Sequence, residues 1–267
     1  MKNQVAIITG ASSGIGRALA YEYARNQWNV VMAARNYAAL KEMETELGAE
    51  NCLAVQCDVT LEADCKLLVD AAIQRFGRID VLINNAGISM RAAFWECKAE
   101  TLCRVVAVNF WGSVYCTKYA RPHLLDVRGS VVGVLSIDCY LGLPGRTAYS
   151  ASKFAIRGFL DTLRVEYRKQ GLHVLVAAPG FVASDIREHA LLADGSPQGQ
   201  SPRNEGRMMT AETCAHHIFK AVKRRKRTLV LSFVHGKLAV FLSKWCPAFV
   251  DFCNYRTMNK EPDSPFK

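Results

Sequence analysis

"VAIITGASSGIG", residues 5–16, places a glycine-rich turn directly after a short apolar run. The apolar run predicts a buried strand, and the residues from Ile15 onward predict a helix. Glycine permits the unusual backbone angles of a tight turn, so Gly10 suits the turn itself. The free N–H groups at the start of a helix favour phosphate. The stretch therefore predicts a strand–turn–helix unit that binds the phosphates of a nucleotide.

Working outward from that unit, apolar runs and helical stretches alternate along the chain. We predict helices at 15–26, 37–47, 61–76, 101–119 and 149–170, with Thr60 capping the third, and strands at 5–9, 30–34, 52–59, 80–87, 130–136 and 173–180. The strands are continuously apolar, which indicates burial on both faces. We therefore expect one α/β domain over residues 1–267, a doubly wound parallel sheet of Rossmann type with helices on both faces. Ligands should bind at the carboxyl ends of its strands.

The composition fits a globular protein without membrane spans or disulfides. Half of the 267 residues are apolar, but no run approaches the ~20 apolar residues of a spanning helix. The N-terminus lacks a signal-peptide pattern, so we expect a cytoplasmic protein. None of the ten cysteines forms a Cys-x-x-Cys pair, and most lie in apolar runs. We interpret them as small buried hydrophobic residues and expect no metal site.

The net charge of +10 is concentrated in places, above all in "KRRKR" at 223–227. This run is either the solvated end of a helix or a contact for an anionic lipid surface or an anionic substrate. No aromatic residues lie between these charges, so we expect no nucleic-acid partner. The C-terminal tail, about 237–267, mixes apolar and aromatic residues with lysines and is interrupted at Pro247. It either covers the core or a subunit contact, which we favour, or forms a peripheral membrane face with the basic run.

The end of the second predicted strand bears on the choice of cofactor. An acidic residue there would bind the ribose hydroxyls of NAD, whereas a basic residue suits the 2′-phosphate of NADP. The chain reads "VVMAARN" at 30–36, with Arg35 and no acid. We therefore expect NADP(H) as cofactor and Arg35 as its phosphate ligand. The alternative for Arg35 is an ordinary surface residue at a helix start.

Six motifs follow one another on the expected elements. They are "TGASSGIG" (9–16), "NNAG" (84–87), Asn109, Ser136, "YSASK" (149–153) and "PGFVAS" (179–184). With these motifs the chain resembles the classical short-chain dehydrogenase/reductase family, from about residue 3 to 185. The resemblance implies an NADP(H)-dependent oxidoreductase that interconverts a ketone or aldehyde and an alcohol. The alternative is a non-catalytic NADP(H)-binding sensor on the same fold.

The resemblance also implies the site residues. The catalytic set is Asn109, Ser136, Tyr149 and Lys153, in which Tyr149 moves a proton and Ser136 binds the substrate oxygen. Lys153 lies one helical turn from Tyr149, so its ammonium should lower the pKa of the phenol, and Asn109 would position a water that relays protons to Lys153. The cofactor-binding set is Gly10, Ser12, Ser13, Gly14, Ile15, Gly16, Arg35, Asp58, Val59, Asn85, Ala86, Gly87, Tyr149, Lys153, Pro179, Gly180, Val182 and Ser184.

The substrate region departs from the family pattern and leaves the substrate open. Leu135 and Cys139 replace residues common in the family, and Asp138 and Cys139 should shape the pocket. Residues 185–209 are polar and rich in Gly and Pro, as expected for a lid. "ALLADGSPQG" in this lid resembles a lipid-associated branch that includes acyl- and alkyl-dihydroxyacetone-phosphate reductases. We expect a hydrophobic small-molecule substrate.

Two further expectations concern the lid and the assembly. Arg187, Arg203 and Arg207 either meet a substrate phosphate or keep the lid soluble. The resemblance also implies a homodimer or homotetramer, paired through the helices at about 101–119 and 149–170.

Overall fold

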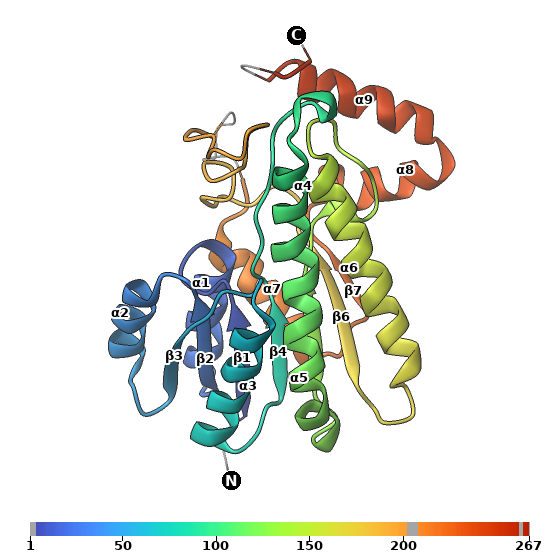
Figure 1. Ribbon diagram of the computed structural model, residues 1–267. Helices are drawn as coiled ribbons and strands as arrows, with labels where there is room; N and C mark the ends of the chain where they lie inside the picture. Colours follow the sequence, from blue (N-terminus) through green and yellow to red (C-terminus); the bar gives the residue numbers. More distant parts are fainter. Residues whose placement is uncertain (1–3, 202–207, 262–263, 267) are drawn as a thin grey trace.

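A parallel sheet of seven strands runs through the centre of the protein. The computed structural model describes residues 4–201, 208–261 and 264–266 (Figure 1). The strand order is β3-β2-β1-β4-β5-β6-β7, and all neighbouring strands are parallel. The strands are β1 Val5–Thr9, β2 Asn29–Ala34, β3 Cys52–Gln56, β4 Val81–Asn84, β5 Ser130–Val134, β6 His173–Ala178 and β7 Thr228–Val230. The order reverses between β1 and β4, where such sheets bind ligands beyond the carboxyl ends of the strands.

Helices cover both faces of this sheet, which confirms the predicted fold class. One face packs against α1, α2 and α7, and the other against α3, α5 and α6. The helices are α1 Gly14–Arg25, α2 Tyr37–Leu47, α3 Glu62–Phe76, α4 Ala99–Val106, α5 Gly112–Asp126, α6 Thr147–Glu166, α7 Ala211–Lys223, α8 Ala239–Trp245 and α9 Pro247–Asn259. Short 3₁₀ turns lie at Phe94–Glu96 and Ile137–Cys139, and π-helical segments at Ala107–Trp111 and Phe233–Leu238.

The apolar strands divide their side chains between two cores. In β1, Ala6 and Ile8 join the core under α1 and α7, whereas Val5 and Ile7 join the core under α3 and α5. All five residues of β1, and likewise of β5, are buried. This two-sided burial is what the uninterrupted apolar runs predict.

Local boundaries differ from the prediction in several places. Thr60 does not cap α3, because its hydroxyl donates to Asp58 Oδ1 and Leu61 is the N-cap residue instead. β3 and β4 end earlier than predicted, at Gln56 and Asn84. The helix expected at 101–119 is two α-helices joined by a π-helical segment. The sequence did not predict β7, which is only three residues long.

The cysteines behave largely as predicted. Six of the ten are buried: Cys52, Cys57, Cys65, Cys116, Cys139 and Cys214. Among the described residues, no group of histidines, cysteines and acids could hold a metal ion.

The basic run and the C-terminal tail lie at opposite ends of the molecule. Arg225 donates to the carbonyls of Arg128 and Gly171, which directly precede β5 and β6. In contrast, α9 lies at the end where α4 and α6 begin (Figure 1). The idea of one face that combines the basic run with the tail is therefore wrong. No helix in the described part of the chain has the length and apolar character needed to cross a membrane.

Candidate active site

The glycine-rich turn between β1 and α1 has the geometry that its sequence predicts. Gly10 has a φ of 65°, which strains any residue with a Cβ atom. A Cβ on Gly16 would overlap the carbonyl oxygen of Gly10, so this position admits no side chain without a shift of the turn. Ser13 is the N-cap residue of α1 but makes no side-chain capping hydrogen bond. The positive end of α1 is therefore left for an anionic ligand, as the turn requires if it binds a pyrophosphate.

Thr9 and Asn85 join this turn to the loop that follows β4. The hydroxyl of Thr9 accepts from the backbone N–H groups of Asn85 and Ala86, both at 3.0 Å. The side chain of Asn85 donates to the carbonyls of Thr9 (2.9 Å) and Gly10 (3.2 Å). Sequence reasoning placed Asn85 beside the cofactor but missed Thr9, whose role depends on contacts about 75 residues away.

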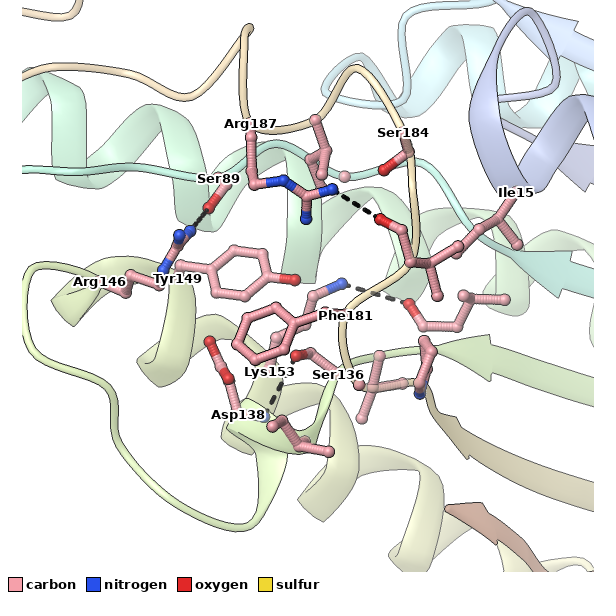
Figure 2. Close-up of a pocket in the computed structure, with 18 of the residues that line it drawn as sticks. Ile15, Ser89, Ser136, Asp138, Arg146, Tyr149, Lys153, Phe181, Ser184 and Arg187 are labelled. Carbon is pink, nitrogen blue, oxygen red and sulfur yellow. Dashed lines mark hydrogen bonds between the residues drawn. The ribbon is translucent and has the colours of Figure 1, made fainter. Parts of the chain in front are cut away.

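Tyr149 and Lys153 face each other on α6, as their spacing predicts. The Lys153 ammonium lies 5.4 Å from the centre of the Tyr149 ring and donates to the carbonyl of Val134 at 3.2 Å. Both side chains are buried, with 7% and 6% of their surface exposed. Figure 2 shows the phenol, the ammonium and the Ser136 hydroxyl converging on one space. This is the arrangement needed to move a proton to or from one substrate oxygen.

The pKa of Tyr149 does not shift in the expected direction in the protein alone. Burial raises it above its ordinary value, the charge of Asp138 adds to the increase, and Arg146 and a hydrogen bond with Ser136 oppose it. Burial also lowers the pKa of Lys153 to about 8. In the protein alone, desolvation therefore outweighs the two influences that lower the pKa of Tyr149, the charge of Arg146 and the hydrogen bond with Ser136. At neutral pH the phenol keeps its proton.

Ser136 and Asp138 line the pocket at the start of the 3₁₀ turn after β5, where Ser136 is the N-cap residue. Ser136 Oγ accepts from the backbone N–H of Asp138 at 3.2 Å. Asp138 lines the pocket although only 2% of its surface is exposed. Cys139 does not share this role, since it packs into the core under α5 and α6. The expectation that both residues shape the pocket is therefore met only by Asp138.

Asn109 lies in the π-helical segment between α4 and α5, a type of bulge that is frequent at functional sites. Its amide exchanges two hydrogen bonds with the backbone of Ile88 and donates a third to Ser152 Oγ at 2.9 Å. Ser152 in turn donates to the carbonyl of Tyr149 at 2.7 Å. Asn109 thus connects the loop after β4 to α6. A Cβ on Gly87 would lie 3.2 Å from Asn109 Oδ1 and 3.5 Å from Lys153 Nζ, so this glycine keeps the two groups adjacent.

The pocket at these residues unites most of the predicted nicotinamide end with three of the four predicted catalytic residues, and Asn109 does not line it. Its predicted members are Ile15, Asn85, Gly87, Ser136, Tyr149, Lys153, Pro179, Gly180, Val182 and Ser184. Its further lining is mostly apolar and comes from Val134, Leu135, Ile137, Leu143, Phe181 and Ile186. Sequence reasoning missed two polar wall residues, Ser89 and Arg146, which hydrogen-bond each other at 2.6 Å (Figure 2). Neither residue belongs to a recognisable motif.

The segment expected to be the lid lies over this pocket. Arg187 lines the pocket and donates to the carbonyl of Val182 at 2.8 Å. Leu191 exchanges backbone hydrogen bonds with the loop after β4, donating to Ser89 and accepting from Arg91. These bonds fix one edge of the segment above Tyr149. Arg203 and Arg207 lie outside the described residues.

The remaining predicted cofactor residues follow β2 and β3, beside the glycine turn. Arg35 is exposed directly after β2, and the backbone N–H of Ala11 in the glycine turn bonds to Ala33 beside it. Asp58 follows β3, where Oδ1 accepts from the backbone and hydroxyl of Thr60 and so shapes its own turn. Val59 is buried against α5. The glycine turn, Arg35 and Asp58 thus follow three adjacent strands, β1, β2 and β3, at one edge of the sheet.

Comparison with known proteins decides the family. A profile described as "short chain dehydrogenase" matches residues 4–193, which is most of the chain. The chain belongs to the short-chain dehydrogenase family. Its site is therefore that of a family whose members are oxidoreductases that use nicotinamide cofactors.

Among curated short-chain dehydrogenases, two relatives illustrate the range of similarity. Dehydrogenase/reductase SDR family member 7B of Bos taurus is 36% identical over 256 residues, covering 92% of this chain and 79% of the relative. An 11-beta-hydroxysteroid dehydrogenase of Pinus massoniana is 38% identical over 190 residues, covering 70% and 53%. Such relatives support interconversion of an alcohol and a ketone with NAD or NADP.

Solved short-chain dehydrogenases share the fold. A family member from Burkholderia phymatum in complex with NAD superimposes with a TM-score of 0.76 at 26% identity, covering 85% of this chain and 88% of that one. One from Streptomyces avermitilis gives a TM-score of 0.81 at 24% identity, covering 96% and 98%. The latter likeness extends beyond the family profile and concerns the fold alone.

Proposed function

We propose that the protein is an NADP(H)-dependent oxidoreductase that interconverts a hydrophobic ketone or aldehyde and the corresponding alcohol. The observation that carries the proposal is the buried pair of Tyr149 and Lys153, which meets Ser136 in a pocket with a mainly apolar wall. A sensor that only binds the cofactor would not need a buried ammonium against a phenol. Burial of that cation lowers the stability of the fold, and a catalytic role would explain why the site contains it.

The residues present fit a nicotinamide dinucleotide. The uncapped N-terminus of α1 and the narrow turn at Gly10 would hold the pyrophosphate, and Pro179, Gly180, Val182 and Ser184 would line the nicotinamide end. Arg35, with no acid nearby at the end of β2, would bind the 2′-phosphate and so favour NADP(H). When bound, this cofactor supplies or accepts the hydride.

Tyr149, Lys153 and Ser136 would share the work at the substrate oxygen. The phenol of Tyr149 is protonated at neutral pH, so it donates to a carbonyl oxygen during reduction. The ammonium of Lys153 then stabilises the phenolate that forms, and the Ser136 hydroxyl stabilises the negative charge that develops on the substrate oxygen. Asn109 would hold Ile88 and Ser152, and with them the position of α6. In oxidation the same groups act in reverse.

The pocket wall supports a hydrophobic substrate. Nine of its lining residues are apolar: Ile15, Val134, Leu135, Ile137, Leu143, Pro179, Phe181, Val182 and Ile186. Such a wall binds an apolar body while a few polar groups orient the reacting oxygen. The steroid named for the Pinus massoniana relative belongs to this class of molecule. We therefore propose a lipid-like alcohol or ketone as substrate.

We also propose a homodimer paired through α5 and α6. On α6 and the π-helical segment before α5, Trp111, Phe154 and Val165 expose 46%, 45% and 72% of their surface. Exposed apolar side chains of this size favour burial against a second copy. A dimer would leave the pocket mouth at the end of the sheet open.

The proposal is tested by following NADPH consumption across a panel of ketones that includes keto-steroids, ketosphinganine and acyl-dihydroxyacetone phosphate. Turnover of at least one hydrophobic ketone, with NADPH preferred over NADH, is the expected result. Tight NADPH binding without turnover across the panel and in the reverse direction with alcohols would instead favour the sensor.

A further inference from the structure

Large exposed aromatic side chains are concentrated on the two C-terminal helices. Phe241, Trp245, Phe249, Phe252 and Tyr255 expose between 50% and 73% of their surface. We call these five residues the aromatic face. Among the described residues, fourteen large hydrophobic side chains are exposed, so this short hairpin holds more than a third of them. Such a concentration of exposed aromatic side chains on one short segment indicates an interaction surface.

The aromatic face does not cover the core. On α9 only Val250 and Met258 are buried, and on α8 no residue is. The aromatic residues repeat at helical spacing, with Phe241 and Trp245 one turn apart and their ring centres 6.4 Å apart. The hairpin thus buries only Val250 and Met258 and leaves its large aromatic side chains exposed. This is the reverse of what covering a core requires.

The charges beside the aromatic face are mainly positive. Lys237, Lys244, Arg256 and Lys260 are exposed on the hairpin and its approach, against the single acid Asp251 in the same stretch. With 7 and 13 residues, α8 and α9 are too short to cross a bilayer but suit a position in its interface. Aromatic rings and basic side chains are the two groups that bind the headgroup region of an anionic membrane. A contact between two copies of this face would instead bring like charges together.

The C-terminal segment is anchored beside the pocket. Glu261, just after α9, forms a buried ion pair with Arg91 at 3.5 Å, in the loop that carries Ser89. The ring of Phe266 lies 6.2 Å from that of Trp95 and 6.1 Å from that of Tyr255. Phe266 also lies 3.5 Å from where a Cβ on Gly145 would be, next to the pocket residue Arg146. Tyr255 of the aromatic face is thus joined through Phe266 to the residue that precedes Arg146 in the pocket wall.

We propose that the α8–α9 hairpin docks on an anionic lipid surface through the aromatic face. Docking places the pocket at the membrane, so that a lipophilic ketone or alcohol passes between the bilayer and Tyr149. This inference rests on the proposed function for the substrate but not for the binding itself. The basic run at 223–227 takes no part, because it lies at the opposite end of the sheet.

Vesicle flotation tests the docking directly. The probes are vesicles of phosphatidylcholine with phosphatidylserine, and vesicles of phosphatidylcholine alone. The protein should float with the anionic vesicles and release at high salt. Trp245→Ser/Phe249→Ser should weaken binding at least about tenfold. Burial of each of these side chains in the lipid should stabilise binding by more than about 1 kcal/mol, and the variant loses both. Lys244→Glu/Arg256→Glu should weaken it about as strongly.

Matched variants control for general changes in hydrophobicity and charge. Leu61→Ser/Leu67→Ser removes two exposed apolar side chains from the α3 region, and Lys223→Glu/Arg224→Glu reverses two charges of the basic run. Both should bind vesicles like the unaltered protein. Turnover of a water-soluble ketone should be the same in all variants, which separates failure of docking from failure of the proposed chemistry.

Two outcomes would overturn the inference. One is equal flotation of the Trp245→Ser/Phe249→Ser variant and the Leu61→Ser/Leu67→Ser control. The other is that, without vesicles, the Trp245→Ser/Phe249→Ser variant sediments as a smaller oligomer than the unaltered protein. The substitutions would then have separated copies of this chain, and the aromatic face would be a contact between them.

Discussion

The buried ammonium of Lys153 lowers the stability of the fold and serves the proposed chemistry. An ammonium with 6% of its surface exposed has lost most of its water, and its hydrogen bond to Val134 and the Tyr149 ring replace that water only in part. The depressed pKa of about 8 expresses this cost. Residues that weaken the fold in this way are typical of active sites.

Replacing Lys153 with Met should therefore stabilise the fold while abolishing turnover. At pH 7 we expect the free energy of unfolding to rise by about 1–3 kcal/mol, because the buried cation is gone. Between pH 8 and 10 the unfolded state binds a proton that folded Lys153 releases, so the unaltered protein regains this stability as pH rises. Urea unfolding of both proteins at pH 7 and at pH 10 measures the difference in the free energy of unfolding. A gain that is equal at pH 7 and pH 10 would contradict the role assigned to the buried charge.

Arg35 gives a second prediction for a single residue. Arg35→Asp should lower kcat/KM with NADPH at least about tenfold and raise it with NADH, because a carboxylate repels a 2′-phosphate and accepts from ribose hydroxyls. Initial rates with both cofactors measure the ratio. Arg25→Asp, an exposed change at the far end of α1, is the charge control and should leave the ratio unchanged. An unaltered ratio in Arg35→Asp would remove Arg35 from the cofactor site.

At the level of elements, repeated patterns were predictable from sequence and tertiary contacts were not. The runs at 5–9 and 37–47 coincide with β1 and α2, because the apolar pattern of a buried strand and the periodicity of a helix depend only on residues close in sequence. The π-helical segment around Asn109 depends on Ile88 and Ser152, which are distant in sequence, so a plain helix was expected. β7 has too few residues to show a hydrophobic periodicity.

The same limit applies to the candidate site. Tyr149, Lys153 and Ser136 belong to local motifs, and the structure brings them together as predicted. Arg146 and Ser89 lie in no motif and meet only in the folded chain. The sequence shows the ammonium near Tyr149 but not the burial that raises the pKa of its phenol in the protein alone. The lower pKa expected from Lys153 together with the charge of the bound cofactor stays a prediction.

Ser152 tests the link between the π-helical segment and α6. Ser152→Ala removes the hydrogen bond acceptor of Asn109 and should lower kcat several-fold with little change in the binding of NADPH. The Ser152 hydroxyl also donates to the carbonyl of Tyr149, so the variant loses two buried hydrogen bonds, which should cost about 1–3 kcal/mol of stability. Ser150→Ala, which removes only a 3.4 Å hydrogen bond from Leu143, is the matched control. Equal kcat values for the two variants would show that Ser152 only supports the fold.

For the whole molecule, the position of the C-terminal tail depends on the ion pair of Arg91 and Glu261. Each side chain exposes 7% of its surface, so removing one charge leaves the other buried without this partner. Glu261→Ala should therefore lower the free energy of unfolding by about 2–4 kcal/mol. Exposed Glu100→Ala on α4 should change it by less than about 0.5 kcal/mol. Chemical denaturation compares the two, and similar values would mean that the pair does not hold the tail.

The central claim is that the phenol of Tyr149 carries the proton. The most direct measurement is kcat of Tyr149→Phe with a ketone substrate, alongside the dissociation constant for NADPH. We predict a fall in kcat of roughly 10³-fold, since a phenyl ring cannot donate a proton, and NADPH binding within a few-fold of the unaltered protein. A variant that retains near-normal kcat would contradict the account.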